Sequence, residues 1–260
     1  MMNYIYDENI LDHTHLARLY DVVFSNERKM PSDFETKLAA HMARGISLSA
    51  AQRRNIDAEE EDFAACITSL PLSGLDMQEY CFAAQHSLTE HLQCFSYPGM
   101  GVYIFKSPHL YMTVRCGEVG QKGNGGHAHN DQLSITLRID GVDLIRDPGT
   151  YLYTPLPEER NRFRSTRVHF TIQKGGEEQN PFYSYRGGLF SLKEEKTFAT
   201  VLYLTRTGIV MEHRGFGDKV YRVIEILDHE VHVRDYGKEI TRIRGDMDYS
   251  DGYGKLLRRV

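Results

Sequence analysis

The spacing of apolar positions changes from helical to strand-like near residue 95 of this chain. Upstream of that point, apolar side chains recur every three or four positions, as they do along one face of an amphipathic helix. This spacing predicts four helices, over residues 16–24, 34–45, 47–70 and 73–92. We therefore expect residues 1–94 to form a short helical region, which is either a small bundle or the end of a larger helical domain.

Downstream of residue 95 the apolar positions repeat with a period of two. β-branched and aromatic residues fill short runs that end at glycine, proline or aspartate. These runs are GVYIFKS, LYMTVRCG, LSITLRIDG, DLIRDPG, VHFTIQKGG, TFATVLYLTRTG, IVMEHRG and VYRVIEILDHEVHVRDYG. Asp140-Gly141 is a hairpin turn signal between two of them. Residues 95–260 should form a large antiparallel β-sandwich with no helix between its strands, so the predicted fold class is mainly β.

The composition is ordinary for a globular protein and argues against two kinds of partner. The chain has 260 residues, with 36 acidic and 31 basic side chains and a formal net charge of −5, so no basic excess indicates nucleic-acid binding. No apolar run approaches the roughly 20 residues that a membrane-spanning helix needs. The first residues lack the basic and apolar segments of a signal peptide. The chain would be cytoplasmic if it is complete and periplasmic if its amino terminus has been truncated.

Two histidines follow a glycine-rich turn in the sequence GGHAHND at 125–131. His127 and His129 are two positions apart, and Asp147 in RDPGTY and His169 in RSTRVHF come further along the chain. On a strand, His127 and His129 would point to the same face. Imidazole and carboxylate are ligands that zinc prefers, and three protein ligands plus water form a common site. One histidine could then bind a metal while the other faces a substrate.

A cluster of basic residues lies between Asp147 and His169. It consists of Arg160, Arg162, Arg164 and Arg167. Because guanidinium binds carboxylate or sulfate in a bidentate manner, the cluster could hold an anionic sugar. The alternative is a solvated strand edge whose arginines pair with the neighbouring glutamates at 158 and 159.

These segments together resemble a known family. The run GGHAHNDQLSITLRIDGVDLIRDPGTYLY, followed by RNRFRSTRVHFTI, is similar to the carboxy-terminal β domain of the heparinase II/III-like polysaccharide lyases. The similarity is strongest over residues 95–172 and continues more loosely towards the end of the chain. Members of that family pair a helical toroid with an antiparallel β-sandwich, and the active cleft lies between the two. The resemblance implies that residues 1–94 are the end of such a toroid.

The resemblance also implies a metal site. By matching position, His129, Asp147 and His169 correspond to the ligands of a bound zinc ion with a structural role. Asp131 would orient a histidine from outside the ligand set or cap a turn, since groups that hold metal ligands in place are often carboxylates.

The chemistry that the resemblance implies is β-elimination on an acidic polysaccharide that contains uronic acid. The proton alpha to the uronate carboxylate is removed, an enolate forms, and the glycosidic oxygen at the 4-position departs. By matching position, His127 corresponds to the catalytic histidine of the β domain. Tyr153 is a candidate for the phenol of this reaction, and Arg162 and Arg164 are candidates for binding the substrate.

Two functions remain open at this stage. The first is a polysaccharide lyase-type domain that is only part of a complete enzyme and needs the helical half of the cleft for turnover. The second is a non-catalytic carbohydrate-binding or structural β domain of a surface-polysaccharide-related protein, because a fold does not determine a function.

Overall fold

The computed structural model of the chain describes residues 60–120, 123–183, 188–243 and 248–257. Contacts divide the chain into two compact units, residues 1–52 and 53–260, and all described residues belong to the second. The helices predicted over 16–24 and 34–45 therefore lie outside the described residues. The described end of the third predicted helix is helical, as α3 (Glu60–Ser69).

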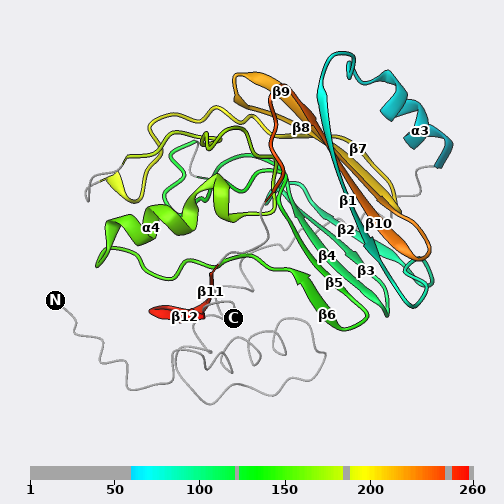
Figure 1. Cartoon of the computed structure of the whole chain (residues 1–260), viewed down its shortest axis with the longest axis horizontal. Helices are drawn as coiled ribbons and strands as arrows, with labels where there is room; N and C mark the ends of the chain where they lie inside the picture. Colours follow the sequence, from blue (N-terminus) through cyan, green and yellow to red (C-terminus); the bar gives the residue numbers. More distant parts are fainter. Residues whose placement is uncertain (1–59, 121–122, 184–187, 244–247, 258–260) are drawn as a thin grey trace, which may run out of the picture. The chain divides into compact units, whose positions relative to one another are not determined.

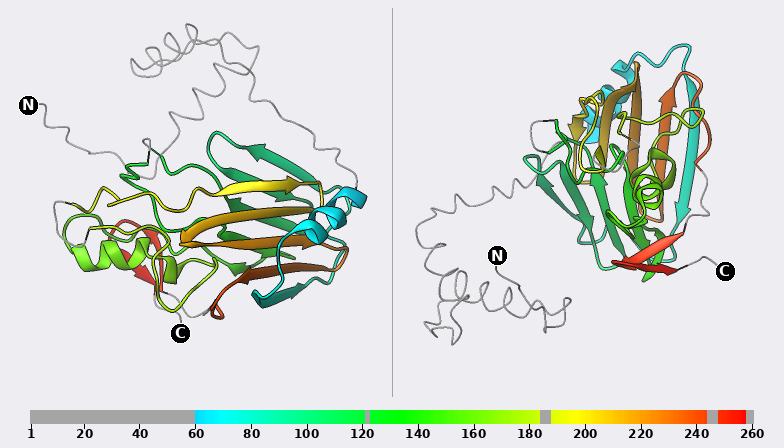
Figure 2. Two further views of the ribbon diagram at one scale, coloured as in Figure 1. Left: turned by 90° about the horizontal axis from the view of Figure 1, so that it is seen from above. Right: turned by 90° about the vertical axis from the view of Figure 1, so that its left-hand side faces the viewer.

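Two five-stranded antiparallel sheets form most of this unit, and Figures 1 and 2 show them lying against each other. The first has the strand order β1 (Asp76–Ala83), β10 (Glu230–Gly237), β9 (Asp218–Ile226), β8 (Gly208–Phe216) and β7 (Thr200–Leu204). The second has the order β2 (Gln93–Tyr97), β3 (Val102–Lys106), β4 (Leu110–Arg115), β5 (Ile135–Ile139) and β6 (Val142–Ile145). A separate ribbon consists of β11 (Tyr249–Gly252) and β12 (Lys255–Leu257).

The inner faces of the two sheets make one hydrophobic core. Phe105, Met112 and Leu137 from the second sheet belong to the same buried cluster as Ile224 and Val233 from the first. Buried and partly buried positions alternate along β10, as expected for a strand with one face against the core. The outer face of the first sheet is partly covered by α3, whose Phe63 packs with Val210 and Val223. The predicted mainly β antiparallel sandwich is confirmed.

One ion pair is buried within this sandwich. The Nε and Nη2 atoms of Arg222 donate to the two carboxylate oxygens of Asp235 at 2.6 and 2.7 Å. The Nη1 atom donates to the carbonyls of Leu133 and Phe170, at 2.6 and 2.7 Å. Arg222 is 0% exposed and Asp235 is 1% exposed, so the charge is removed from water, but each of the three guanidinium nitrogens donates a hydrogen bond. These contacts join β9 and β10 to the loops at 133 and 170.

The helix predicted over 73–92 is wrong. Residues Asp76–Ala83 form β1, which pairs with β10 from Asp76–Gly237 to Ala83–Glu230. β1 is an edge strand with mostly exposed side chains, so its sequence lacks the apolar alternation that predicts a strand, and pairing with β10 determines its conformation. The sandwich therefore includes residues upstream of position 95.

The expectation that no helix interrupts the strands is also wrong. The helix α4 (Pro157–Arg164) and the 3-10 helix η1 (Thr166–Val168) lie between β6 and β7. Proline in the first turn favours a helix start, but α4 is too polar and short to show an apolar period. The run at 168–176 forms no strand apart from an isolated bridge between Gln173 and Thr241.

The hairpin predicted at Asp140-Gly141 is confirmed between β5 and β6. Both residues have positive φ, 50° and 81°, as the tight turn of a two-residue hairpin requires. None of the helices in the described ranges is long and apolar enough to span a lipid bilayer.

Candidate functional site

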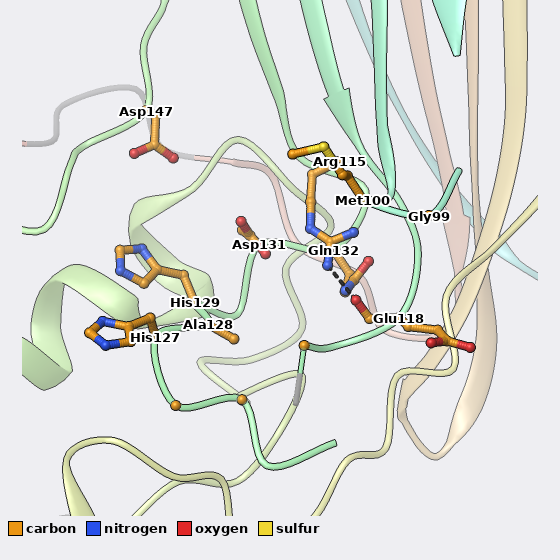
Figure 3. Close-up of a pocket in the computed structure, with 13 residues that line it drawn as sticks. Gly99, Met100, Arg115, Glu118, His127, Ala128, His129, Asp131, Gln132 and Asp147 are labelled. Atoms are coloured by element: carbon orange, nitrogen blue, oxygen red, sulfur yellow. Dashed lines mark hydrogen bonds between the residues drawn. The ribbon is translucent and has the colours of Figure 1, made fainter. Parts of the chain in front are cut away.

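A cavity of about 560 Å³ opens at one end of the second sheet. The β2–β3 turn, the end of β4 and the loop that follows β4 form its wall (Figure 3). Its lining residues are Gly99, Met100, Arg115, Glu118, Gly120, Gly125, Gly126, His127, Ala128, His129, Asp131, Gln132 and Asp147. The cavity thus brings the GGHAHND segment together with Asp147, which was predicted to act with it.

The GGHAHND segment is a loop and not the strand that would place both histidines on one face. Gly125 has a φ of 58°, and a Cβ atom at this position would lie 2.8 Å from Leu192 and 2.9 Å from Val119. The loop is held by buried amides: Asn130 donates to Glu178 Oε2 at 2.7 Å and to the Asn180 carbonyl at 2.8 Å. These contacts hold the loop in place, although it has no strand pairing.

Glu178 connects the loop to the segment that carries His169. Its carboxylate accepts hydrogen bonds from the Ser165 hydroxyl, from the Thr166 backbone N–H at 2.8 Å and from the Thr166 hydroxyl at 3.0 Å. The Asn130 amide donates to the same carboxylate. The two histidine-bearing segments are therefore positioned by one shared acceptor.

The predicted metal ligands His129 and His169 face each other. Nδ1 of His129 lies 3.2 Å from Nε2 of His169, and Asp147 Oδ2 lies 3.7 Å from the same Nε2 atom. Nδ1 of His169 is 2.8 Å from the Ser165 carbonyl, which must accept its proton. His169 Nε2 consequently keeps a lone pair, which is the arrangement usual for a metal-binding histidine.

His129 also carries its ring proton on Nδ1, although this is the nitrogen that faces His169. Arg160 Nη1 lies 3.0 Å from His129 Nε2, and guanidinium is always a donor, so Nε2 accepts and Nδ1 carries the proton. That proton then points to His169. Burial, followed by the neighbouring charges of His169 and Arg160, lowers the pKa of His129 well below its usual value, so the ring is neutral.

Two imidazoles and one carboxylate are suitable ligands for zinc, but the ligand atoms of His129, Asp147 and His169 do not all lie close enough together to bind one ion. Two triads in the described part of the chain have all their ligand atoms within 4.8 Å of one another, and His129, Asp147 and His169 are not one of them. Asp147 has a half-exposed side chain, and its Oδ1 accepts from the Gly149 N–H at 2.8 Å. Metal binding would bring this carboxylate closer and replace the hydrogen bond between the two histidines.

His127 lies beside an aromatic cluster and is exposed to the cavity. Its ring contacts Tyr153 edge-on, with centroids 5.6 Å apart, and Phe190 at 5.2 Å. Tyr153 also contacts Phe190 and Tyr253, at 5.6 and 5.5 Å. The structure therefore brings the two predicted catalytic side chains together, with Tyr153 half-buried as a packing partner of His127.

The predicted substrate-binding arginines do not line the cavity. Arg162 forms ion pairs with Glu159 at 2.7 Å and Asp248 at 3.0 Å, so carboxylates of the chain already occupy its guanidinium. Arg164 is 0% exposed and donates to Asn161 Oδ1 and to the Tyr183 carbonyl. Burial and then the nearby guanidinium of Arg160 lower the pKa of Arg164 to about 10.

Arg115 is a cavity-lining cation that the sequence analysis did not single out. Its Nη1 and Nη2 atoms donate to the carbonyls of Gly101 at 3.1 Å and Glu118 at 2.7 Å, which fix the guanidinium on the cavity wall (Figure 3). Within the described ranges no carboxylate forms an ion pair with it. Arg115 is the last residue of β4, and nothing in the sequence around it distinguishes it from other strand residues. Its place on the cavity wall is therefore known only from the fold.

Comparison with known proteins now defines the family. A family model described as "Heparinase II/III-like, C-terminal" matches residues 91–234. The chain belongs to this family. A search of curated proteins gave no match.

Solved structures with similarity to the chain include a heparinase III gene product and a heparan sulfate lyase. A heparinase III gene product matches with a TM-score of 0.43 and 20% identity, over 55% of this chain and 22% of that chain. Heparan sulfate lyase HepC from Pedobacter heparinus matches with a TM-score of 0.35 and 18% identity, over 48% of this chain and 18% of that chain. The heparinase III product with methylated lysines aligns over 94% of this chain and 47% of that one, with a TM-score of 0.41 and 17% identity. The chain thus spans less than half the length of each of these proteins.

In this heparinase II/III-like domain, Asp131 lies on the cavity wall close to Asp147 and Arg115 (Figure 3). Burial raises the pKa of its carboxyl, while the charges of His169 and Arg115 act in the opposite direction. No hydrogen bond joins its carboxylate to His129 or His169 among the described residues. The carbonyl of Ser165 and the side chain of Arg160 instead orient those two rings. The orienting role of Asp131 stays a prediction.

Proposed function

We propose that this chain is the β domain of a polysaccharide lyase that cleaves a uronic-acid-containing polysaccharide by β-elimination. The observation that carries the proposal is the exposed ring of His127 on a cavity that Arg115 also lines. The membership of the chain in the heparinase II/III-like family supports a relation to lyases of this kind.

Each of these two side chains has a chemical role in the proposed reaction. The proton alpha to a uronate carboxylate is weakly acidic, and its removal needs a donor that stabilises the enolate oxygens. Arg115 can donate to that carboxylate, because its guanidinium has N–H groups left after the two carbonyl contacts. His127, whose ring is exposed to the cavity, can accept the alpha proton as a general base. The electron pair of the broken C–H bond then forms the double bond, and the 4-oxygen leaves with its pair.

Residues His129, Asp147 and His169 would hold a zinc ion in the same proposal. When bound, zinc would hold the two histidine-bearing segments together and add positive charge at the edge of the cavity. His129 would have to carry its ring proton on Nε2 and lose its contact with Arg160. Tyr153 would support the ring of His127 by packing, and its hydroxyl remains a candidate for the proton donor to the leaving oxygen.

The test uses the protein as the cell makes it and a panel of uronic-acid polysaccharides, including heparan sulfate, hyaluronan and alginate. Unsaturated uronate produced by the reaction raises the ultraviolet absorbance. We expect His127→Ala to abolish this rise, Arg115→Met to raise KM and reduce kcat, and the exposed control His229→Ala to behave as the unmodified protein. If His127→Ala retains full activity, the catalytic assignment is wrong. Binding without any product would identify a carbohydrate-binding domain.

A further inference from the structure

A second group of metal-binding side chains lies at the opposite end of the second sheet from the cavity. His109 lies in the β3–β4 turn and Asp140 in the β5–β6 turn, while the cavity includes the β2–β3 turn and the end of β4. Figure 1 shows these two turns at the end of the sheet away from α4. His86, just after β1, joins them from the first sheet.

The two histidine rings face the same carboxylate oxygen of Asp140. Asp140 Oδ1 is 2.8 Å from Nδ1 of His86 and 3.2 Å from Nδ1 of His109. The two imidazole rings are stacked, with centroids 4.2 Å apart and planes within 12° of parallel. Both Nδ1 atoms face Asp140 Oδ1, and all three ligand atoms lie within 4.8 Å of one another.

The carboxylate of Asp140 is fixed independently of the histidines. Its second oxygen, Oδ2, accepts the backbone N–H of Gln85 at 2.7 Å, which turns Oδ1 towards the rings. Its backbone N–H donates to the His109 carbonyl at 2.9 Å, and its positive φ is fixed by the hairpin turn. Because the backbone of all three segments holds the group, little conformational freedom would be lost when it binds a ligand.

We propose that His86, His109 and Asp140 form a second binding site, for a divalent transition metal such as Zn²⁺. Two imidazoles and one carboxylate are a preferred donor set for this class of ion. Bonds of about 2.0–2.2 Å to one tetrahedral ion would place the ligand atoms roughly 3.3 Å apart, so Asp140 Oδ1 and His109 Nδ1, at 3.2 Å, need hardly move and His86 Nδ1, at 2.8 Å, would move slightly outward. The metal would replace the protons that the rings share with Asp140.

The site is open to solvent, whereas at the cavity His169 is buried and His129 is half-buried. The side chains of His86 and His109 are 56% and 38% exposed, so free coordination positions would face water. The other triad of ligand atoms in the described part, Glu79 with Cys81 and His232, is less suited. There Arg234 forms ion pairs with Glu79 and Glu225 and places a competing positive charge beside the group.

The experiment titrates the chelator-treated chain with Zn²⁺ by calorimetry and with Co²⁺ by visible absorption. His86→Ala, His109→Ala and Asp140→Asn are compared with the control His229→Ala, another exposed histidine beside a carboxylate. Asparagine tolerates the positive φ of residue 140, so the turn is kept. Each of the three variants should lose one bound ion or bind it at least about tenfold more weakly. Loss of a residue that only hydrogen-bonds to a metal ligand already weakens binding by about tenfold or more, and loss of a ligand should cost at least as much.

The outcomes separate this site from the proposed zinc centre of the lyase. A parallel His129→Ala variant should lose a different ion and leave the second site intact. Binding that is equal in His109→Ala and His229→Ala would overturn the proposal. So would weaker binding in His86→Ala alone, because the site needs both rings.

Discussion

Replacing Arg160 with methionine should leave the stability of the chain nearly unchanged, whereas replacing Arg222 with methionine should lower it strongly. The two arginines are equally buried, at 1% and 0% exposure. Their hydrogen bonding differs: Arg222 uses three nitrogens, and Arg160 leaves Nε and Nη2 without a partner in the described part of the chain. The two variants therefore test which property of a buried guanidinium determines its contribution to folding stability: its burial, or the hydrogen bonding of its N–H groups.

The expected magnitudes follow from those contacts. Arg222→Met leaves the buried Asp235 carboxylate without its counter-charge, which costs about 3–5 kcal/mol of unfolding free energy. Arg160→Met removes one hydrogen bond to His129 and the contacts with the rings of Tyr153 and Phe190. It also removes two buried donors that have no hydrogen-bond partner, and the loss of each should stabilise the chain by about 1–3 kcal/mol. The terms nearly cancel, so we expect a net change below about 1.5 kcal/mol.

Thermal and urea unfolding of the two variants measure this difference. In a unit of this size each kcal/mol shifts Tm by about 2–4 °C, so Arg222→Met should lower Tm by roughly 6–20 °C. Arg160→Met should shift it by less than about 6 °C. If the two variants lose the same stability, the reasoning from unsatisfied donors is refuted.

Three further predictions concern the cavity and the response to pH. His129→Ala and Asp147→Ala should each remove a zinc ion measured by elemental analysis, and a chain that purifies without metal and ignores chelators would contradict the zinc proposal. Glu178→Gln should loosen the loop at 125–131 because it weakens four hydrogen bonds, which faster amide exchange there would reveal. Burial and the charge of Arg222 lower the pKa of His213 to about 3. Unfolding releases this ring to a pKa of about 6.5, so stability should fall as the pH decreases from 6.5 towards 3, by up to about 1.4 kcal/mol per pH unit. His213→Gln should flatten that slope in acid denaturation curves.

The sequence predicted the sandwich because its inner strands carry a strong apolar pattern. β8 and β9 are almost wholly buried and rich in β-branched residues, and their runs read as strands without any tertiary information. β1 failed the same test, because an edge strand with exposed side chains is defined by its partner and not by its own pattern. The short polar helix α4 failed for a related reason, since its stability comes from contacts made in the folded chain.

The site was predictable in its residue types but not in their partners. The sequence analysis singled out His127, His129 and Asp147 as acting together, and the structure places all three on the wall of one cavity. Arg115 was missed because a single arginine at the end of a strand has no local signature. The pairing of Arg162 with Glu159 and Asp248 depends partly on a residue 86 positions away, which no local pattern reveals.

The pairing of β1 with β10 constrains how the chain can be made. The contact between Cys81 and His232 joins residues 151 positions apart, so the first strand of the sandwich meets its partner only after nearly all of the domain has left the ribosome. Until then β1 has no strand to pair with, and an unpaired strand favours association with other chains. Expression yield should therefore depend on the rate of synthesis and on chaperones that bind nascent chains, and β1 should be the last strand to gain protection as the domain folds.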